Sequence, residues 1–315
     1  MKRSIVVVGS INVDLVVRTN RNPQVGETLQ GSDFAIFTGG KGANQAAAAA
    51  RLGHDVHLIG KVGSDVFAAK PLNELRETGV HAEAVGVAEG PTGMASILTT
   101  AAGDNTIIVV PGANAHVLPA DLVGHRSLIE GAGIVLTQLE TPMETLTALA
   151  VMCEQSNTPL ILDPAPAQEL PAHLLSRITW FTPNETEAAL LSGRAIDSSS
   201  GHDLRAAAEF FLSAGVRNVV LKLGARGVYL ATEDGTREHI DPFQVVAEDS
   251  TAAGDAFNGG FAVALMRGDT PVEAARFASA VAAISVTRRG ALPSMPRLNE
   301  VNEFLAGAAV NAFPL

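Results

Sequence analysis

Short apolar runs alternate with longer amphipathic stretches along most of the chain. The short runs are rich in Val, Ile and Leu and end at glycine or polar residues, which predicts buried β-strands. They lie at residues 4–8, 56–59, 134–139, 160–162, 179–181, 219–223 and 228–230. The longer stretches have helical spacing and lie at residues 41–52, 66–78, 119–130, 143–155, 184–191, 203–213, 253–266 and 271–286. Repeated strand–helix units predict an α/β fold with helices on both faces of a mostly parallel sheet, and ligands at the carboxyl ends of its strands.

Two other segments, residues 14–38 and 92–110, have a thinner pattern in which apolar and polar residues alternate. This pattern is typical of half-exposed antiparallel strands. We therefore expect one domain over residues 1–315, with these segments forming a small β-sheet lid. Because such a sheet is marginally stable alone, we expect ligand or a second copy of the chain to cover it, as in a homodimer joined through the lid.

Composition excludes several classes of function. The 33 acidic and 22 basic residues give a net charge of -11, which disfavours nucleic acid as a partner. A nucleotide can still bind at the backbone N–H groups of a helix N-terminus. The single cysteine, Cys153, precludes an intramolecular disulfide. The first apolar run is too short for a signal peptide and no run reaches the about 18 residues of a membrane span, so we expect a cytoplasmic protein without a membrane segment.

The strongest chemical motif is Asp-Ser-Thr-Ala-Ala-Gly-Asp at residues 249–255, which leads into a predicted helix. Small residues at this position let consecutive backbone N–H groups converge on an anion, and the helix dipole assists. Asp255 has two possible roles. It is either a general base that takes the proton from an attacking hydroxyl group, or a carboxylate that stabilises the first turn of the helix. This segment alone favours the second role.

A second motif, Thr-Gly-Gly-Lys-Gly-Ala-Asn-Gln at residues 38–45, precedes another predicted helix. Its glycines let the backbone pass close to a ligand, and the amides of Asn44 and Gln45 pair with hydroxyl groups. The spacing matches neither a Walker A loop nor a dinucleotide-binding fingerprint. The structural alternative is a glycine-rich turn ahead of an alanine-rich core helix, and it leaves Asn44 unexplained.

Three weaker features have structural alternatives of their own. Asn12 and Asp14 share one face of an extended segment, which suits vicinal hydroxyl groups, but an Asx turn explains them more simply. Asn184 and Glu187 have the spacing of a capping box, and the functional alternative is contact, direct or through water, with Mg²⁺ and phosphate oxygens. Residues 223–227 form either a hairpin turn or a loop whose backbone meets a nucleotide.

The eight histidines predict no site. His54 and His57 are expected to face opposite sides near a strand, and no pattern of supporting groups accompanies them. We expect the histidines to be structural or solvated, and Cys153 to be inert core.

Taken in order, these motifs resemble those of the ribokinase family of carbohydrate kinases, within the larger group often named for a bacterial phosphofructokinase. Residues 39–45 resemble its N-terminal signature and residues 249–255 its C-terminal signature, with residues 184–187 between them. The resemblance extends from about residue 5 to about residue 305. It implies a ribokinase-like three-layer sandwich with a small β-sheet lid, and phosphorylation of D-ribose at O5 by ATP, with Mg²⁺ and K⁺ as cofactors.

The resemblance also implies roles for single residues. Asp255 matches the catalytic base, and Ala252, Ala253 and Gly254 match the backbone anion hole. The positions that match the sugar site are Asn12, Asp14, Gly40, Lys41, Gly42, Ala43, Asn44, Glu140 and Asp255. The positions that match the nucleotide site are Asn184, Glu187, Lys222, Leu223, Gly224, Ala225, Arg226, Gly227, Gly254, Asp255 and Ser279. The positions that match a monovalent-cation loop are Asp249, Thr251, Ser285, Arg288, Gly290 and Ser294.

Three positions bear on how far the resemblance extends. Asp163 stands where many relatives have Asn, and Ala252 replaces the Gly of the wider group, but neither change removes a catalytic group. Ile11 favours ribose over deoxyribose, since deoxyribokinases tend to carry Met there. The alternatives are a kinase for deoxyribose, another sugar or a nucleoside, and, in a different class, a catalytically silent sugar-binding regulator. An intact Asp255 argues against the regulator.

Overall fold

The computed structural model describes residues 3–102 and 104–311, so residues 1, 2, 103 and 312–315 of the predicted domain lie outside this description. The main sheet is built from β1 (Ile5–Val8), β4 (Val56–Gly63), β5 (Val80–His81), β6 (Val85–Ala88), β9 (Ile134–Thr137), β10 (Leu160–Leu162), β11 (Trp180–Phe181), β12 (Asn218–Lys222), β13 (Val228–Thr232) and β14 (Arg237–Ile240). Their order is β14-β13-β12-β11-β10-β9-β1-β4-β5, with β6 paired to β4. Neighbours from β12 to β5 are parallel, whereas β13 and β14 add an antiparallel edge. The mostly parallel sheet is therefore confirmed.

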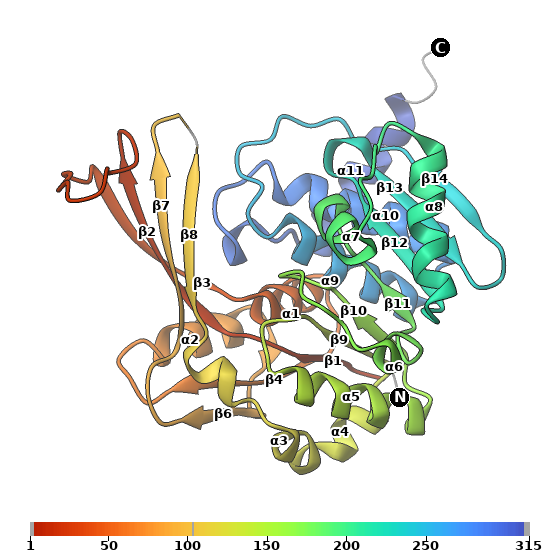
Figure 1. Ribbon diagram of the computed structural model, residues 1–315, viewed down its shortest axis with the longest axis horizontal. Helices are drawn as coiled ribbons and strands as arrows, with labels where there is room; N and C mark the ends of the chain where they lie inside the picture. Colours follow the sequence, from red (N-terminus) through yellow and green to blue (C-terminus); the bar gives the residue numbers. More distant parts are fainter. Residues whose placement is uncertain (1–2, 103, 312–315) are drawn as a thin grey trace.

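Helices cover both faces of this sheet (Figure 1). One face carries α1 (Lys41–Arg51), α2 (Ala69–Glu77), α9 (Ala253–Arg267), α10 (Pro271–Ser285) and α11 (Leu298–Asn311). The other carries α3 (Pro119–Gly124), α4 (Arg126–Gly131), α5 (Met143–Ser156), α6 (Ala172–Leu175), α7 (Glu185–Ser192) and α8 (Gly201–Ser213). The alternation of β1 explains the layers, because Ile5 and Val7 join one apolar core while Val6 and Val8 join the other. The predicted three-layer sandwich is confirmed.

Several elements differ from the sequence prediction. The helix expected at residues 119–130 is two helices, because the backbone of His125 leaves the helical region with φ of -115° and ψ of 19°. The strands β5, β6 and β14 and the helices α6 and α11 were not predicted. Cys153 is buried, as expected. Among the described residues, no helix is long and apolar enough to cross a membrane.

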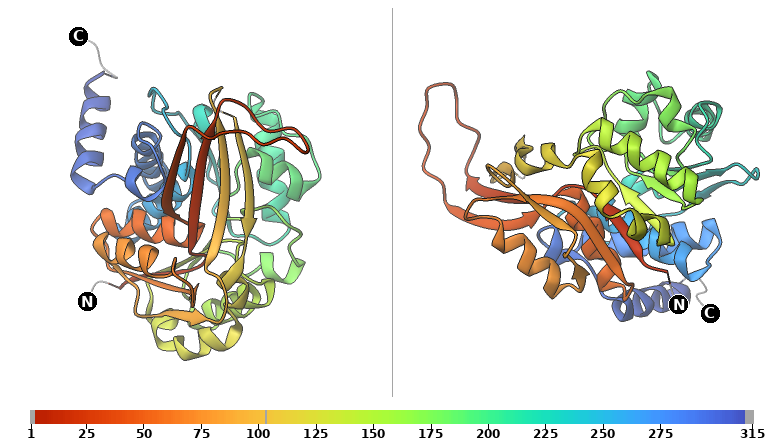
Figure 2. Two further views of the ribbon diagram at one scale, coloured as in Figure 1. Left: turned by 90° about the vertical axis from the view of Figure 1, so that its left-hand side faces the viewer. Right: turned by 90° about the horizontal axis from the view of Figure 1, so that it is seen from below.

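The predicted lid is a separate sheet with strand order β3-β2-β7-β8. Its strands are β2 (Asn12–Thr19), β3 (Asp33–Gly39), β7 (Gly93–Thr100) and β8 (Asn105–Val110). The strands extend away from the body of the molecule, and Figure 2 shows them from a second side. β2 follows β1 after three residues, while β3 leads directly into α1, so the lid is attached next to the carboxyl end of β1.

Candidate active site

Glu140 joins the ends of two neighbouring strands. β1 pairs with β9 in parallel register, with Val8 opposite Thr137, so the segments that follow them emerge at the same edge of the sheet. There the Ser10 hydroxyl group donates a hydrogen bond to Glu140 Oε2, and the backbone N–H of Lys41 donates to the same oxygen over 3.2 Å. Glu140 therefore holds the end of β1 against the start of α1.

Two glycines let α1 begin against the end of β1. Gly40 has φ of +90°, which side chains rarely tolerate. Gly42 lies so close to Gly9 that a Cβ on Gly42 would stand 2.6 Å from the Gly9 carbonyl carbon. The backbone N–H of Ala43 then donates to the Ser10 carbonyl group over 2.9 Å. Backbone packing, the structural alternative considered for this motif, thus accounts for the two glycines and for buried Ala43.

Asp255 lies in the first turn of α9 and is held by two amides of α1. Its Oδ2 accepts a hydrogen bond from Asn44 Nδ2 at 2.9 Å, and its Oδ1 accepts one from Gln45 Nε2 at 3.0 Å. The helices can approach this closely because Gly259 faces α1, and a Cβ there would lie 2.6 Å from Ala48 Cβ. Packing of the glycine-rich turn leaves Asn44 unexplained, whereas its bond to Asp255 gives it a position and a partner.

The surroundings of Asp255 suit proton transfer. Burial raises the pKa of Asp255 to about 6; the positive charge of Lys41 opposes this rise and the negative charge of Asp163 adds to it. A carboxylate with such a pKa is ionised at pH 7 and accepts a proton more readily than an exposed carboxylate. Its position in the first turn of α9 also fits helix stabilisation, so the two roles are separated by the mutation described in the Discussion.

Asp14 lines a cavity of about 470 Å³ between the lid and two loops of the body, which contribute Asp249 and Gly290. Burial raises the pKa of Asp14 to about 7, and the negative charges of Glu140 and Asp255 add to this rise. The lid thus brings Asp14 into the electrostatic field of the other two carboxylates. This arrangement provides several acceptors for the hydroxyl groups of a small polar ligand.

Asn12 is positioned by a residue that the sequence did not single out. Asn114 Nδ2 donates to Asn12 Oδ1 at 2.7 Å, and Asn114 Oδ1 accepts from the backbone N–H of Ile11 at 2.9 Å. Both asparagines are buried. Only the fold brings them together across 102 positions, and the segment Gly112–His116 that carries Asn114 gave no clear signal in the sequence.

Lys41 supplies positive charge among the carboxylates. Burial disfavours its ammonium group, but the negative charges of Asp255, Asp163, Glu140 and Glu187 outweigh burial and raise the pKa of Lys41. The group therefore stays protonated at neutral pH. A fixed cation in this position can stabilise negative charge that develops during phosphoryl transfer.

A buried network behind Asp255 was also missed. Gln45 Nε2 donates to both Asp255 Oδ1 and Asp163 Oδ2, each at 3.0 Å, while Gln45 Oε1 accepts from Gln138 Nε2 at 2.7 Å. Asp163 Oδ1 in turn accepts from Lys222 Nζ at 2.8 Å. Gln45 therefore orients Asp255, and Asp163 orients Gln45. The sequence marked Asp163 as unusual but did not indicate these partners.

A second cavity, of about 320 Å³, lies beside the N-terminus of α9. Its lining includes Lys222, Gly224, Ala225, Gly227, Gly254 and Ser279, all predicted for the nucleotide, together with Phe243 and Phe257, which were not. The side chain of Leu223 is part of the apolar core instead, and the guanidinium group of Arg226 pairs with Glu185. The predicted loop bends back between two antiparallel strands, so it is a hairpin connection that also borders a cavity.

The N-terminus of α9 has the geometry expected for anion binding. Ala252 adopts φ of +60°, a left-handed conformation rare for alanine, and Ala253 begins the helix. Gly254 and Asp255 follow in the first turn, where backbone N–H groups have no acceptor within the helix. A Cβ on Gly254 would lie 3.3 Å from Lys222 Nζ, so the turn and this ammonium group lie side by side.

Asn184 and Glu187 form the predicted capping box. The Glu187 backbone N–H donates to Asn184 Oδ1 at 2.8 Å, and the Asn184 backbone N–H donates to Glu187 Oε2 at 2.7 Å. The capping box expected as the structural alternative is therefore present, and neither residue lines the second cavity. Burial raises the pKa of Glu187, and Lys222 opposes this rise. That coupling places Glu187 near the charged groups of the site.

Asp249 ties together the two segments predicted to hold a monovalent cation. Its Oδ1 accepts from the Thr251 backbone N–H and its Oδ2 from the Gly290 backbone N–H, both at 2.9 Å. Burial opposes ionisation, but these hydrogen bonds outweigh it and lower the pKa of Asp249. Of the other predicted residues, Ser285 and Ser294 are buried, and their hydroxyl groups donate to carbonyl oxygens of their own turns. The Arg288 guanidinium group points to Glu300, with which it pairs.

Comparison with known proteins identifies this arrangement. The pfkB family of carbohydrate kinases matches residues 2–298. The chain belongs to this family. The chain is therefore a carbohydrate kinase, and the family resemblance found in the sequence motifs is confirmed.

Relatives of known activity match nearly the whole chain. A ribokinase of Haemophilus influenzae is 40% identical over 98% of this chain and 100% of its own length. A deoxyribokinase of Salmonella typhimurium is 35% identical over 96% of this chain and 98% of its own. A solved structure of Arabidopsis thaliana ribokinase with ribose and ATP superposes with a TM-score of 0.90 at 34% identity, covering 97% of this chain and 99% of that one.

Proposed function

We propose that this chain transfers the γ-phosphoryl group of ATP to the 5-hydroxyl group of D-ribose, giving ribose 5-phosphate. The observation that carries the proposal is the position of Asp255. It is a buried carboxylate with a raised pKa, and two amide side chains of α1 hold it. It lies in the first turn of α9, whose N-terminus borders the second cavity, and its charge acts on Asp14 in the lid. The ribokinases among its relatives, one of them solved with ribose and ATP, support the choice of substrates.

In the proposed reaction, Asp14 and Asn12 hold hydroxyl groups of the sugar under the lid. Asp255 removes the proton from the 5-hydroxyl group, whose oxygen attacks the γ-phosphorus as the bond to the β-phosphate oxygen breaks. Backbone N–H groups at the N-terminus of α9, that of Gly254 among them, and the Lys41 ammonium group stabilise charge on the transferred group. The lid excludes water that would otherwise compete with the sugar. Mg²⁺ bound to the nucleotide would neutralise phosphate charge, and the carboxylate of Glu187 has the chemistry to hold it.

Measurement of ADP release with a panel of pentoses, hexoses and nucleosides tests this function. We expect D-ribose to give the highest kcat/KM, with 2-deoxyribose below it. A clear preference for deoxyribose, which the Salmonella relative is named for, would replace the substrate but keep the enzyme class. An absence of sugar-dependent ADP release with every acceptor would overturn the kinase assignment in favour of a sugar-binding regulator.

We also propose that K⁺ occupies the loop around Asp249. The Asp249 carboxylate holds the two turns together through their backbone N–H groups, and their carbonyl oxygens are the kind of ligand with which proteins bind large monovalent cations. The ion would order these turns beside the N-terminus of α9 without touching substrate. We predict higher activity in K⁺ than in Na⁺, measured at constant ionic strength. Equal rates in K⁺, Na⁺ and tetramethylammonium would remove the ion from the proposal.

A further proposal is a homodimer formed through the lid. Phe34 on β3 and residues 107–110 on β8 are large exposed apolar side chains on the two edge strands of the lid, and exposed apolar side chains gathered on one small sheet favour an interaction surface. We predict a dimer by light scattering at micromolar concentration and a monomer for Ile108→Asp. The exposed Val123→Asp, on α3 outside the lid sheet, is the matched control and should remain dimeric. A fully active wild-type monomer would contradict the prediction.

A further inference from the structure

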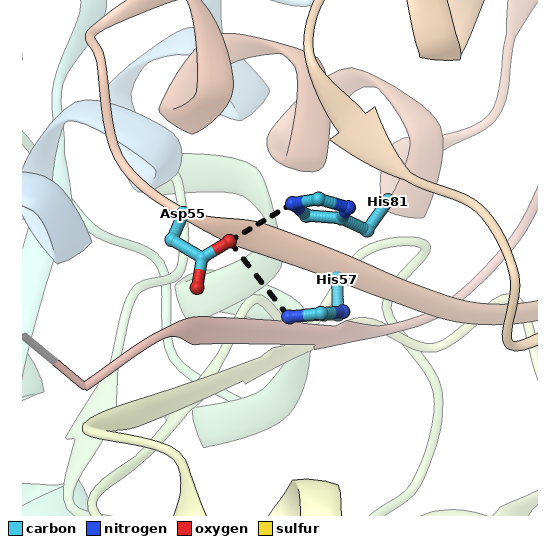
Figure 3. Close-up of side chains that lie close together, drawn as sticks. All are labelled: Asp55, His57 and His81. Carbon is cyan, nitrogen blue, oxygen red and sulfur yellow. Dashed lines mark ion pairs between the residues drawn. The ribbon is translucent and has the colours of Figure 1, made fainter.

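Asp55, His57 and His81 form a compact cluster outside both cavities (Figure 3). Asp55 Oδ1 lies 3.0 Å from His81 Nε2 and 3.8 Å from His57 Nε2. The two imidazole rings stack with their centroids 4.6 Å apart and an angle of 21° between their planes. Figure 3 shows that both rings direct one nitrogen towards the same carboxylate oxygen.

The backbone dictates this juxtaposition. His57 on β4 and His81 on β5 are direct partners in a parallel strand pair, so their side chains stand next to each other on one face. Asp55 precedes β4 and lies two residues before His57, which brings its side chain to the same face. The cluster lies where parallel strands begin, whereas the candidate active site lies where they end. The cluster and the candidate active site therefore lie at opposite ends of the parallel strands.

We propose that this cluster binds one divalent transition-metal ion of the Zn²⁺ class. Two imidazoles and a carboxylate are a common ligand set for zinc, with bond lengths of about 2.0–2.2 Å that place tetrahedral ligand atoms about 3.3 Å apart. The present separations of 3.0 and 3.8 Å bracket this value. All three ligand atoms lie within 4.8 Å of one another, so small side-chain rotations complete the site.

The surroundings favour an open rather than a closed site. The side chains of His57, His81 and Asp55 are 26%, 49% and 52% exposed, which leaves room for water as a fourth ligand. Glu83 Oε2 lies 3.8 Å from His81 Nδ1, the nitrogen not directed at Asp55. A carboxylate at that nitrogen is the usual partner of a metal-bound histidine and fixes its orientation. Imidazole ligands select Zn²⁺, Co²⁺, Ni²⁺ or Cu²⁺ over Mg²⁺ and K⁺, so this site is chemically distinct from those proposed for the kinase reaction.

The bound ion would stabilise the attachment of the outermost strand, β5, to β4. β5 consists of two residues and is the last strand at this end, so few backbone hydrogen bonds hold it to β4. A metal that bridges His57 and His81 crosslinks these strands. From the sequence we expected the histidines to form no site; the proposal departs from that expectation, because the partner of His57 comes from another strand.

Isothermal titration of the full-length protein with ZnCl₂, in excess Mg²⁺ to occupy carboxylate sites, tests the proposal. We expect one Zn²⁺ per chain, and a loss of affinity of about tenfold or more in His81→Asn and Asp55→Asn. His202→Asn is the matched control, because the His202 side chain is exposed and its Nδ1 lies 3.2 Å from the carboxylate of Asp203, outside the cluster. It should bind Zn²⁺ like the wild type.

Thermal unfolding gives a second readout that does not depend on kinase activity. Saturating Zn²⁺ should raise the Tm of the wild type and of His202→Asn, because ligand that binds only the folded state stabilises it. The Tm of both cluster variants should respond much less. Because Asp55 is half exposed, Asp55→Asn is expected to fold even if His81→Asn does not. Equal Zn²⁺ affinity in wild type and both cluster variants, or no binding to the wild type, would overturn the proposal.

Discussion

Asp255→Asn is expected to lower kcat by about 10²–10⁴-fold, the usual scale for losing a general base. The substitution keeps the size of the side chain but removes its ability to accept the proton of the sugar hydroxyl group. Nucleotide binding should persist or improve slightly, because a negative charge next to the phosphates is lost. Turnover within a few-fold of wild type would show that Asp255 is not the base.

The network around Asp255 indicates that this variant should fold. Both carboxylate oxygens accept hydrogen bonds from amide groups, so the new NH₂ group would face a donor. Asn44 can resolve this conflict, since its Oδ1 is buried and has no hydrogen-bond partner among the described residues. A 180° rotation of the Asn44 amide would present this oxygen to the new donor. Circular dichroism and Tm on the same preparation then separate a catalytic loss from unfolding.

The opposite outcome is equally specific. If Asp255 only stabilises the first turn of α9, its replacement should cost on the order of 1 kcal/mol or less of stability and leave turnover largely intact.

The pH profile of the wild-type enzyme distinguishes the two roles of Asp255 further. Because burial raises the pKa of Asp255 to about 6, a base in this position is protonated and inactive below that pH. Wild-type kcat/KM should therefore fall as the pH drops through about 6.

Asp14→Ala is expected to weaken sugar binding by roughly 1–3 kcal/mol, which corresponds to about 5- to 150-fold in Kd. If Asp14 and Asn12 hold neighbouring hydroxyl groups, the substitution leaves a sugar hydroxyl group without its buried partner. ATP affinity should be nearly unchanged, because Asp14 lies in the lid strand β2 and the second cavity does not include it. Calorimetric titration with each ligand separately measures both effects.

A carboxylate elsewhere in the lid provides the control for Asp14. Asp33 opens β3, is exposed, and lies within 3.9 Å of Arg18 rather than in the field of Glu140 and Asp255. Asp33→Ala should leave sugar affinity unchanged. An Asp14→Ala variant that binds sugar as tightly as wild type would instead return Asp14 to a purely structural role at the start of the lid.

Much of the architecture was readable from local patterns. The buried strands β1 and β10 and the helices α5 and α9 were predicted within two residues, because their apolar periodicity and their glycine or proline boundaries are local properties of the chain. The break at His125 was not predicted, although Gly124 at the end of α3 is a weak local signal for it. β14 was missed because its alternation is mostly polar and only pairing with β13 defines it.

The sequence by itself determined the family, the fold class and the segments that carry the chemistry, because each motif is a run of neighbouring residues. Tertiary structure alone decided which side chains meet. Asp255 is held by Gln45 across 210 positions, and His57 stacks on His81 across a strand pair. Such contacts depend on the close packing of α1 on α9 and on strand register, which no local pattern encodes. The capping box of Asn184 and Glu187 is local and could be predicted from their spacing. The hydrogen bond between Gln45 and Asp163 could not, because it forms only once distant elements pack together.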